Sequence, residues 1–95
     1  MFDIIKANDN IFLALGSPQQ EADVLKMRAD LMISLALYVK ERDWTQEEAA
    51  ERLGIPQTRV ADLVQGKWKK FSLDMLIGLA TRVGKRVRLE LDEAA

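Results

Sequence analysis

Hydrophobic residues between positions 18 and 42 recur every three or four positions, which is the spacing of one face of an α-helix. The stripe consists of Leu25, Ala29, Met32, Leu35, Ala36 and Val39. We expect a long helix from Pro18 to Arg42. Ser17 and Gln20 have the spacing of a capping box, and proline suits the first helical position.

The middle of this helix is apolar on more than one face. Leu31, Ile33 and Leu37 lie off the main stripe, so a second surface must cover them. The N-terminal segment 1–16 and a second subunit are the two candidates. This segment is too apolar for a disordered tail, and we expect it to pack on the body, on a second copy or on a partner protein. Its apolar residues are Phe2, Ile4, Ile5, Phe12 and Leu15.

Residues 44–67, WTQEEAAERLGIPQTRVADLVQGK, predict two short helices joined by a tight turn. Thr45 and Glu48 form a second capping box, and Trp44 is a candidate hydrophobic staple toward Ala49. Gly54 tolerates the positive φ that the turn requires. The close crossing of the helices needs a small residue, for which we assign Ala50.

The second short helix, about Gln57 to Gln65, docks through Val60, Leu63 and Val64. Its outward face carries polar residues, which favours a helix-turn-helix that enters a DNA groove. A plain helical hairpin is the alternative, but it would not need the small Ala50, both glutamines and a lysine-rich continuation together. The outward residues are Gln57, Thr58, Arg59, Ala61 and Asp62.

After a loop over 67–71, Ser72 caps a helix that ends at Gly84. In the loop, we expect Trp68 to cover the core beside Phe71 rather than to stack at the edge of DNA. The chain then alternates apolar and charged residues in KRVRLEL, which predicts a strand over Arg86–Leu91. A lone strand needs a partner: its counterpart in a second subunit, residues 2–5, or another protein.

The charge pattern favours an anionic partner on one surface only. The 95 residues carry a net charge of −1, but acidic residues dominate before residue 57 and basic residues after it. The cluster Lys67, Lys69 and Lys70 directly follows the second short helix, whereas Lys85, Arg86 and Arg88 form a second cluster. Most runs of basic residues in proteins are ordinary solvated surface charges, and only the position of the first cluster sets it apart.

Composition argues against an enzyme, a metal site or a cofactor. The chain has no cysteine or histidine, which removes disulfides, thiolate nucleophiles, most zinc sites and the usual general base. Glu47, Glu48 and Glu51 share one exposed turn with no histidine, cysteine or glycine-rich loop nearby. We interpret Glu47, Glu51 and Arg52 as solvated helix charges. No apolar run is long enough to span a membrane, and we expect a cytoplasmic protein.

These patterns predict a single, mainly α domain. Residues 1–16 form an attached apolar segment, and residues 17–95 form the helix-turn-helix DNA-binding domain with one C-terminal β-strand.

Three segments resemble the lambda-repressor-like fold of the xenobiotic-response-element class of bacterial regulators: WTQEEAAERLG, PQTRVADLVQGK and FSLDMLIGLATRVG. The resemblance implies a four- to five-helix domain. With the leading NIFLALG and the terminal KRVRLEL, nearly the whole chain resembles antitoxins of type II toxin–antitoxin operons, of the host-inhibition-of-growth kind.

The resemblance implies roles for individual residues. Gln57 corresponds to a glutamine that reads a base edge, Thr58 and Asp62 fall on other base-facing positions, and Arg59 lies toward a flanking base or phosphate. Phosphate-binding positions are Thr45, Gln46, Gln65, Lys67, Lys69 and Lys70. Pro56 departs from the usual Ser or Thr cap. Asp62 must accept from cytosine, pair with Arg59, or discriminate against wrong sequences.

We therefore expect a homodimeric repressor that binds a palindromic operator in double-stranded DNA, with a toxin protein as a further partner. The dimer surface is the Arg86–Leu91 strand or the long first helix. The competing hypothesis is a protein-interaction module that neutralises a toxin without binding DNA.

Overall fold

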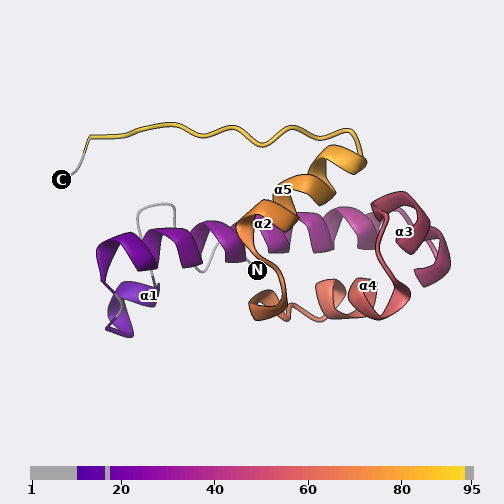
Figure 1. The fold of residues 1–95 in the computed structure, drawn as a ribbon, viewed down its shortest axis with the longest axis horizontal. Coiled ribbons are helices and arrows are strands. Elements are labelled where there is room, and N and C mark those ends of the chain that lie inside the picture. Colours follow the sequence, from indigo (N-terminus) through magenta and orange to yellow (C-terminus); the bar gives the residue numbers. More distant parts are fainter. Residues whose placement is uncertain (1–10, 17, 94–95) are drawn as a thin grey trace.

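The computed structural model describes residues 11–16 and 18–93. These residues form the helices α1 (Ile11–Ala14), α2 (Gln19–Glu41), α3 (Gln46–Leu53), α4 (Gln57–Val64) and α5 (Leu73–Arg82). A short 3₁₀ turn, η2 (Trp68–Lys70), lies between α4 and α5. The mainly helical fold is confirmed, and the long helix lies within one residue of its expected bounds at each end (Figure 1).

Helix α2 is a central rod on which α1, α4 and α5 pack, while α3 packs on α4 and α5. Figure 1 shows α4 on one side of α2 and α5 on the other, with α3 at the C-terminal end of the rod. Helices α2 to α5 contribute apolar side chains to one core, which includes Phe71 from the loop after η2. The buried cluster consists of Met32, Leu35, Val39, Ala49, Leu53, Val60, Leu63, Phe71, Leu76, Leu79 and Ala80.

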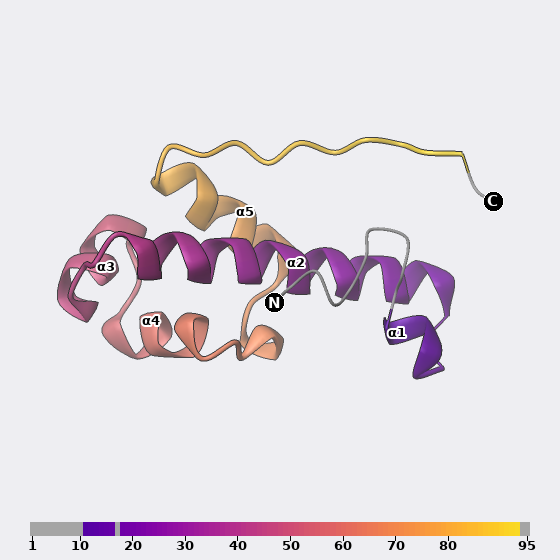
Figure 2. The ribbon, with the colours of Figure 1, turned by 180° about the vertical axis from the view of Figure 1, so that it is seen from behind.

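The predicted stripe of α2 is buried only along its C-terminal part. Met32, Leu35, Ala36 and Val39 are buried, whereas Leu25 and Ala29 are half-buried. The reason is the arrangement of the fold, because α3, α4 and α5 gather around the C-terminal half of the rod (Figure 2).

The start of α2 differs from the expectation by one position. Pro18 has an extended backbone (φ −59°, ψ 154°) and occupies the N-cap, so the helix begins at Gln19. Pro18 makes no side-chain capping bond, and Ser17 lies outside the described residues together with its predicted role as the cap.

The described part of the N-terminal segment packs on the body of the domain. Helix α1 contacts α2, and the ring of Phe12 meets the ring of Trp68 edge-on, with 5.5 Å between the ring centroids. This agrees with one of the three expected placements. Phe2, Ile4 and Ile5 lie outside the described residues.

The predicted C-terminal strand is not confirmed. Residues 85–93, which we call the tail, run extended along α2 toward its N-terminal end (Figure 1). No strand is formed within the part of the chain that the structure describes, because nothing in it pairs with the tail. Val87 packs against the core near Leu31, so the tail covers part of the second apolar face of α2.

Candidate nucleic-acid interface

The start of α3 is fixed by the capping box that the sequence predicts. The Glu48 N–H donates to Thr45 Oγ1 at 3.1 Å, and the Thr45 N–H donates to Glu48 Oε1 at 3.0 Å. Gln46 is therefore held at the first position of α3, where its side chain is exposed. This is a suitable position for binding a phosphate, because the N-terminus of a helix attracts anions.

Trp44 packs before this cap against the core that includes Ala49, and its ring also meets the ring of Tyr38 edge-on. The two ring centroids lie 6.1 Å apart, and the Arg52 guanidinium lies 5.0 Å from the Trp44 ring. Trp44 thus anchors the beginning of α3 to the end of α2.

The turn between α3 and α4 has the geometry that Gly54 was expected to provide. Gly54 has φ +71°, and both its N–H and that of Ile55 donate to the Ala50 carbonyl, at 2.8 and 3.1 Å. A Cβ atom on Gly54 would lie 2.7 Å from Cζ of Arg82. The positive φ favours glycine here, whereas the guanidinium is the far end of a flexible, exposed side chain that can move aside.

Helix α3 carries two neighbouring small residues: Ala49 belongs to the buried core, and Ala50 packs against that core. Ala49 is 1% exposed and Ala50 is half-buried. Ala49 and Leu53 are four residues apart and share the buried face of α3, while the place of Ala50 at the crossing of the two helices stays a prediction.

Helix α4 docks through Val60 and Leu63, which are buried as expected, while Val64 is half-buried. Its first turn points outward: Gln57 and Thr58 are exposed. Pro56 is the N-cap and makes no side-chain capping bond.

Asp62 on α4 is paired with two lysines. Its carboxylate oxygens lie 3.7 Å from Lys67 Nζ and 3.6 Å from Lys70 Nζ, and its side chain is only 15% exposed. This arrangement differs from the pairing with Arg59 that was one of our alternatives. The carboxylate therefore offsets part of the positive charge that the loop presents.

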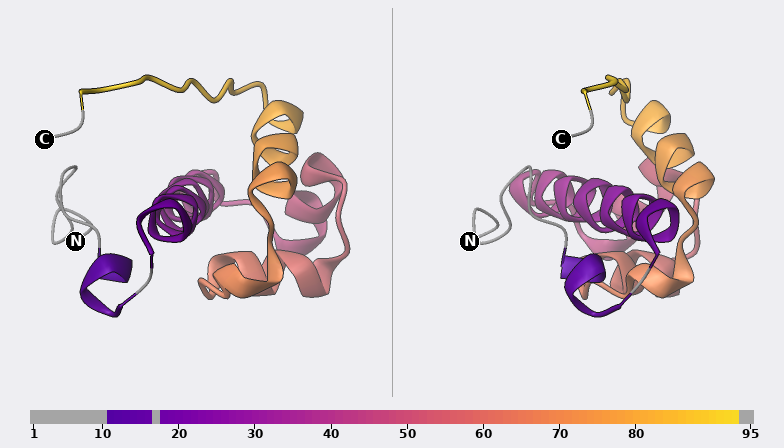
Figure 3. Two further views of the ribbon diagram at one scale, coloured as in Figure 1. Left: turned by 60° about the vertical axis from the view of Figure 1, so that its left-hand side comes forward. Right: turned by 90° about the vertical axis from the view of Figure 1, so that its left-hand side faces the viewer.

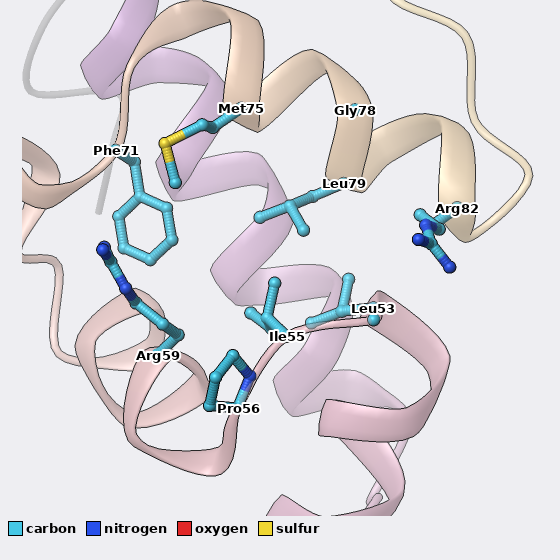
Figure 4. Close-up of a pocket in the computed structure, with 10 residues that line it drawn as sticks. Leu53, Ile55, Pro56, Arg59, Phe71, Met75, Gly78, Leu79 and Arg82 are labelled. Carbon is cyan, nitrogen blue, oxygen red and sulfur yellow. The ribbon is translucent and has the colours of Figure 1, made fainter.

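Arg59 is directed toward the loop after α4. Its Nη1 donates to the Lys70 carbonyl at 2.7 Å, and its guanidinium lies 5.6 Å from the Phe71 ring. Figure 4 shows this side chain extending from α4 toward Phe71 at the edge of an apolar pocket of about 350 Å³. The pocket lies between the α3–α4 turn and α5, where Ile55, Pro56 and Met75 are among its lining residues.

The end of α4 leads the chain directly into the lysine loop. Gly66 has φ +76°, its N–H donates to the Leu63 carbonyl, and the Lys67 N–H donates to the Asp62 carbonyl. These two bonds form a Schellman motif, which reverses the chain with Gly66 in the left-handed conformation. Lys67, Lys69 and Lys70 are exposed along the loop, as is Gln65 at the helix end.

Arg28 of α2 holds this loop, a role that the sequence analysis missed. Its Nε donates to the Phe71 carbonyl at 3.1 Å and its Nη2 to the Trp68 carbonyl at 3.3 Å. The guanidinium also lies 5.3 Å from the Trp68 ring. Trp68 is half-buried against the core that contains Phe71, which confirms its expected packing role. The only sequence signal for Arg28 was a charge next to the apolar stripe.

The predicted site residues thus come from three neighbouring parts of the fold: the start of α3, the outer face of α4 and the loop that contains η2. Helices α3 and α4 pack on each other, and α4 contacts η2. Gln57, Thr58 and Gln46 are exposed, whereas Arg59 and Asp62 are half-buried and bonded within the chain.

The described residues hold no group of three or more acidic, cysteine or histidine side chains that is arranged to bind a metal ion. Within the same ranges, no helix is both long and apolar enough to cross a membrane.

Residues 15–92 match the model of a family described as a helix-turn-helix domain. The chain belongs to this family. The match extends from the end of α1 through the tail and so includes every helix that builds the core. No curated protein matches the chain. As a helix-turn-helix domain, the protein has DNA as its partner.

Proposed function

We propose that this protein is a sequence-specific transcriptional regulator that represses as a homodimer. The observation that carries the proposal is the exposed first turn of α4, where Gln57 and Thr58 project from a helix docked rigidly by Val60 and Leu63. Side chains at this end of a recognition helix reach the edges of bases in the major groove.

The roles divide between reading bases and holding the backbone. The Gln57 amide suits adenine, since it donates and accepts in the same plane, and the Thr58 hydroxyl reads a neighbouring base. Gln46 and the three loop lysines contact phosphates, which fixes the register of the protein on the duplex. Thr45 and Gln65 lie at the helix ends beside them. Arg59 and Asp62 act mainly by positioning the loop, because their polar groups already have partners within the chain.

The proposed operator is a palindrome. A single small module binds weakly, so two copies on half-sites about 34 Å apart provide useful affinity. Each copy then inserts one α4 into the major groove on the same side of the DNA.

Replacing Gln57 by alanine tests the base-reading role. We expect binding to the cognate site, selected from a random DNA pool, to weaken by about 1–3 kcal/mol, with a smaller loss on random DNA. Gel-shift titrations on both DNAs give the comparison. Gln20→Ala, which removes an exposed amide from α2, is the matched control. Equal losses on both DNAs would remove Gln57 from base reading.

We further propose that the regulator is the antitoxin of a toxin–antitoxin operon. The support is the resemblance of the whole-chain arrangement, together with exposed apolar side chains on and after α1 that would suit a protein partner. These are Ile11, Leu13 and Leu15. Binding to the upstream region of its own gene separates this proposal from a module that neutralises a toxin without touching DNA.

A further inference from the structure

The tail has an inverted charge pattern around Leu89. Residues 85–93 read Lys-Arg-Val-Arg-Leu-Glu-Leu-Asp-Glu, so every charge before Leu89 has an opposite charge at the same distance after it. Apolar residues also match: Val87 and Leu91 are each two positions from Leu89. Such a segment is complementary to a second copy of itself running in the opposite direction.

The structure leaves the tail available for pairing. Lys85 still donates its N–H to the Ala80 carbonyl at the end of α5. From residue 86 to residue 93, the backbone forms no hydrogen bond with the rest of the described chain. Leu89 is 75% exposed and Leu91 is fully exposed. Unpaired extended backbone with exposed leucines is an edge that another strand can join.

We propose that two copies of the protein pair their tails as an antiparallel β-ribbon with Leu89 on the two-fold axis. The ribbon would be the dimer surface of the proposed homodimeric regulator. Only the link between this ribbon and DNA binding rests on the proposed function. In the ribbon, each residue lies opposite the one at the same distance beyond Leu89. The opposing pairs are Lys85 with Glu93, Arg86 with Asp92, Val87 with Leu91, Arg88 with Glu90, and Leu89 with Leu89.

Neighbouring registers are unfavourable. A shift that centres the ribbon on Arg88 places two arginines opposite each other, and a centre on Glu90 places two glutamates opposite each other. Like charges directly opposite destabilise a sheet. A register centred between two residues puts apolar side chains opposite charged ones and mixes the two faces. A parallel ribbon would align each charge with its own kind. Only the antiparallel register on Leu89 matches all positions.

The inner face of this ribbon is apolar over its three central positions, with the Lys85–Glu93 pair at each end, and Val87 and Leu89 already contact the body. Val87 lines a pocket of about 260 Å³ with Leu31, Leu35 and Ala80. Leu89 lines an adjoining groove between α2, α5 and the tail, with Met27 and Ile77 among its walls. Because Leu91 lies opposite Val87 of the partner, pairing brings each fully exposed Leu91 to the edge of the partner's pocket. The even-numbered residues form charged pairs on the outer face.

The same geometry orients the two recognition helices. Val87 faces its own body in each copy, so both bodies lie on the same side of the ribbon. Helix α4 lies on the opposite side of the domain from the tail in every view (Figure 3). The two α4 helices therefore both face away from the ribbon, which suits two half-sites on one side of a duplex.

A second copy fits this edge better than a strand from another protein. A strand from another protein needs only charges that complement those of the tail. Pairing with such a strand does not require the tail to be complementary to itself. The inversion about Leu89, extending over four positions on each side, is a requirement only of self-pairing.

Single cysteines test the register directly, because the chain has none of its own. Leu89→Cys places two thiols opposite each other, with Cα atoms about 4.5–5.5 Å apart, which a disulfide can bridge. Leu91→Cys is the matched variant, because its two copies are four residues apart along the ribbon, about 13 Å. We expect mild oxidation to cross-link the Leu89→Cys protein and leave the Leu91→Cys protein uncross-linked. Equal cross-linking of the two, or none at Leu89→Cys, overturns the register.

Charge reversal tests self-pairing in the full chain. Arg88→Glu or Glu90→Arg creates two repulsive pairs per dimer, and we expect each to raise the dimer dissociation constant at least about tenfold. The double variant Arg88→Glu/Glu90→Arg restores complementarity and dimerisation. A mixture of the two single variants forms heterodimers. Glu51→Arg, an exposed reversal on α3, is the control, and circular dichroism verifies folding.

Sizing by light scattering reads out these variants without DNA. A wild-type protein that is monomeric at micromolar concentration, or a double variant that fails to recover, overturns the proposal. Failure of the proposed function gives a different result. If the Leu89→Cys protein cross-links but no DNA is selected from the pool, the ribbon is supported and the regulator proposal is overturned.

Discussion

Asp62 illustrates how a single side chain limits the charge of the DNA-facing surface. A carboxylate on a recognition helix repels phosphates, yet this one lies between Lys67 and Lys70. It reduces the positive potential of the loop. Weaker binding to random DNA is the expected benefit, since non-specific affinity depends on basic charge near the phosphates.

Replacing Asp62 by asparagine separates this role from reading a cytosine. We expect tighter binding to both cognate and random DNA, with a steeper dependence of affinity on salt, because Lys67 and Lys70 are released. Gel shifts over a salt series measure both quantities. Asp74→Asn, an exposed change on α5, is the control. A loss confined to cognate DNA would instead show that Asp62 accepts a hydrogen bond from a base.

At the scale of elements, the loop after α4 is held by arginines from two different helices. Arg28 of α2 bonds the Trp68 and Phe71 carbonyls, and Arg59 of α4 bonds the Lys70 carbonyl. The Trp68 carbonyl also accepts from the Phe71 N–H, but the Lys70 and Phe71 carbonyls would lose their arginine donors beside an apolar core, which is costly. The two arginines thus give the lysines between them a defined position.

Arg28→Met retains most of the apolar stem and removes both bonds. We expect the free energy of unfolding to fall by about 1–3 kcal/mol, because two partly buried carbonyls lose a charged donor. Urea unfolding followed by circular dichroism measures it. Arg42→Met is the control, since Arg42 stacks on Tyr38 and makes no carbonyl bond in the described chain. A change below about 0.5 kcal/mol would leave Arg28 as an ordinary surface charge.

The separation of interacting residues along the chain explains which features could be predicted from sequence. The capping box of Thr45 and Glu48 and the turn at Gly54 depend on residues within ten positions, so their patterns are readable. The bonds of Arg28 join residues 40 and 43 positions apart, and no local pattern encodes them. The tail's extended form was predictable, whereas its hydrogen-bond partner is not in the described chain.

At the scale of the whole molecule, an overall charge of −1 coexists with a basic surface beside α4. The sum is nearly neutral, so attraction to DNA depends on where the lysines are placed. Lys69 and Lys70 are exposed on the loop after α4, where they contact the DNA backbone in the proposed complex.

Replacing both Lys69 and Lys70 by alanine tests this placement. We expect the slope of log affinity against log salt to become shallower by about two units per protomer, since each phosphate contact contributes about 0.9. Affinity measured over a salt series provides the slope. Lys40→Ala on α2, which removes an exposed charge that no proposed contact involves, leaves the slope unchanged. An unaltered slope in the double variant would show that these lysines do not meet phosphates.

The proline that begins α4 has a consequence for how this protein could be stabilised. Pro56 offers no side-chain acceptor, and the N–H groups of Gln57 and Thr58 have no partner within the described residues. A serine there would add about 1 kcal/mol to the unliganded fold by occupying one of these donors. The same donor would then be unavailable to a phosphate at the start of the helix. A more stable fold and tighter DNA binding would therefore require the same backbone N–H group.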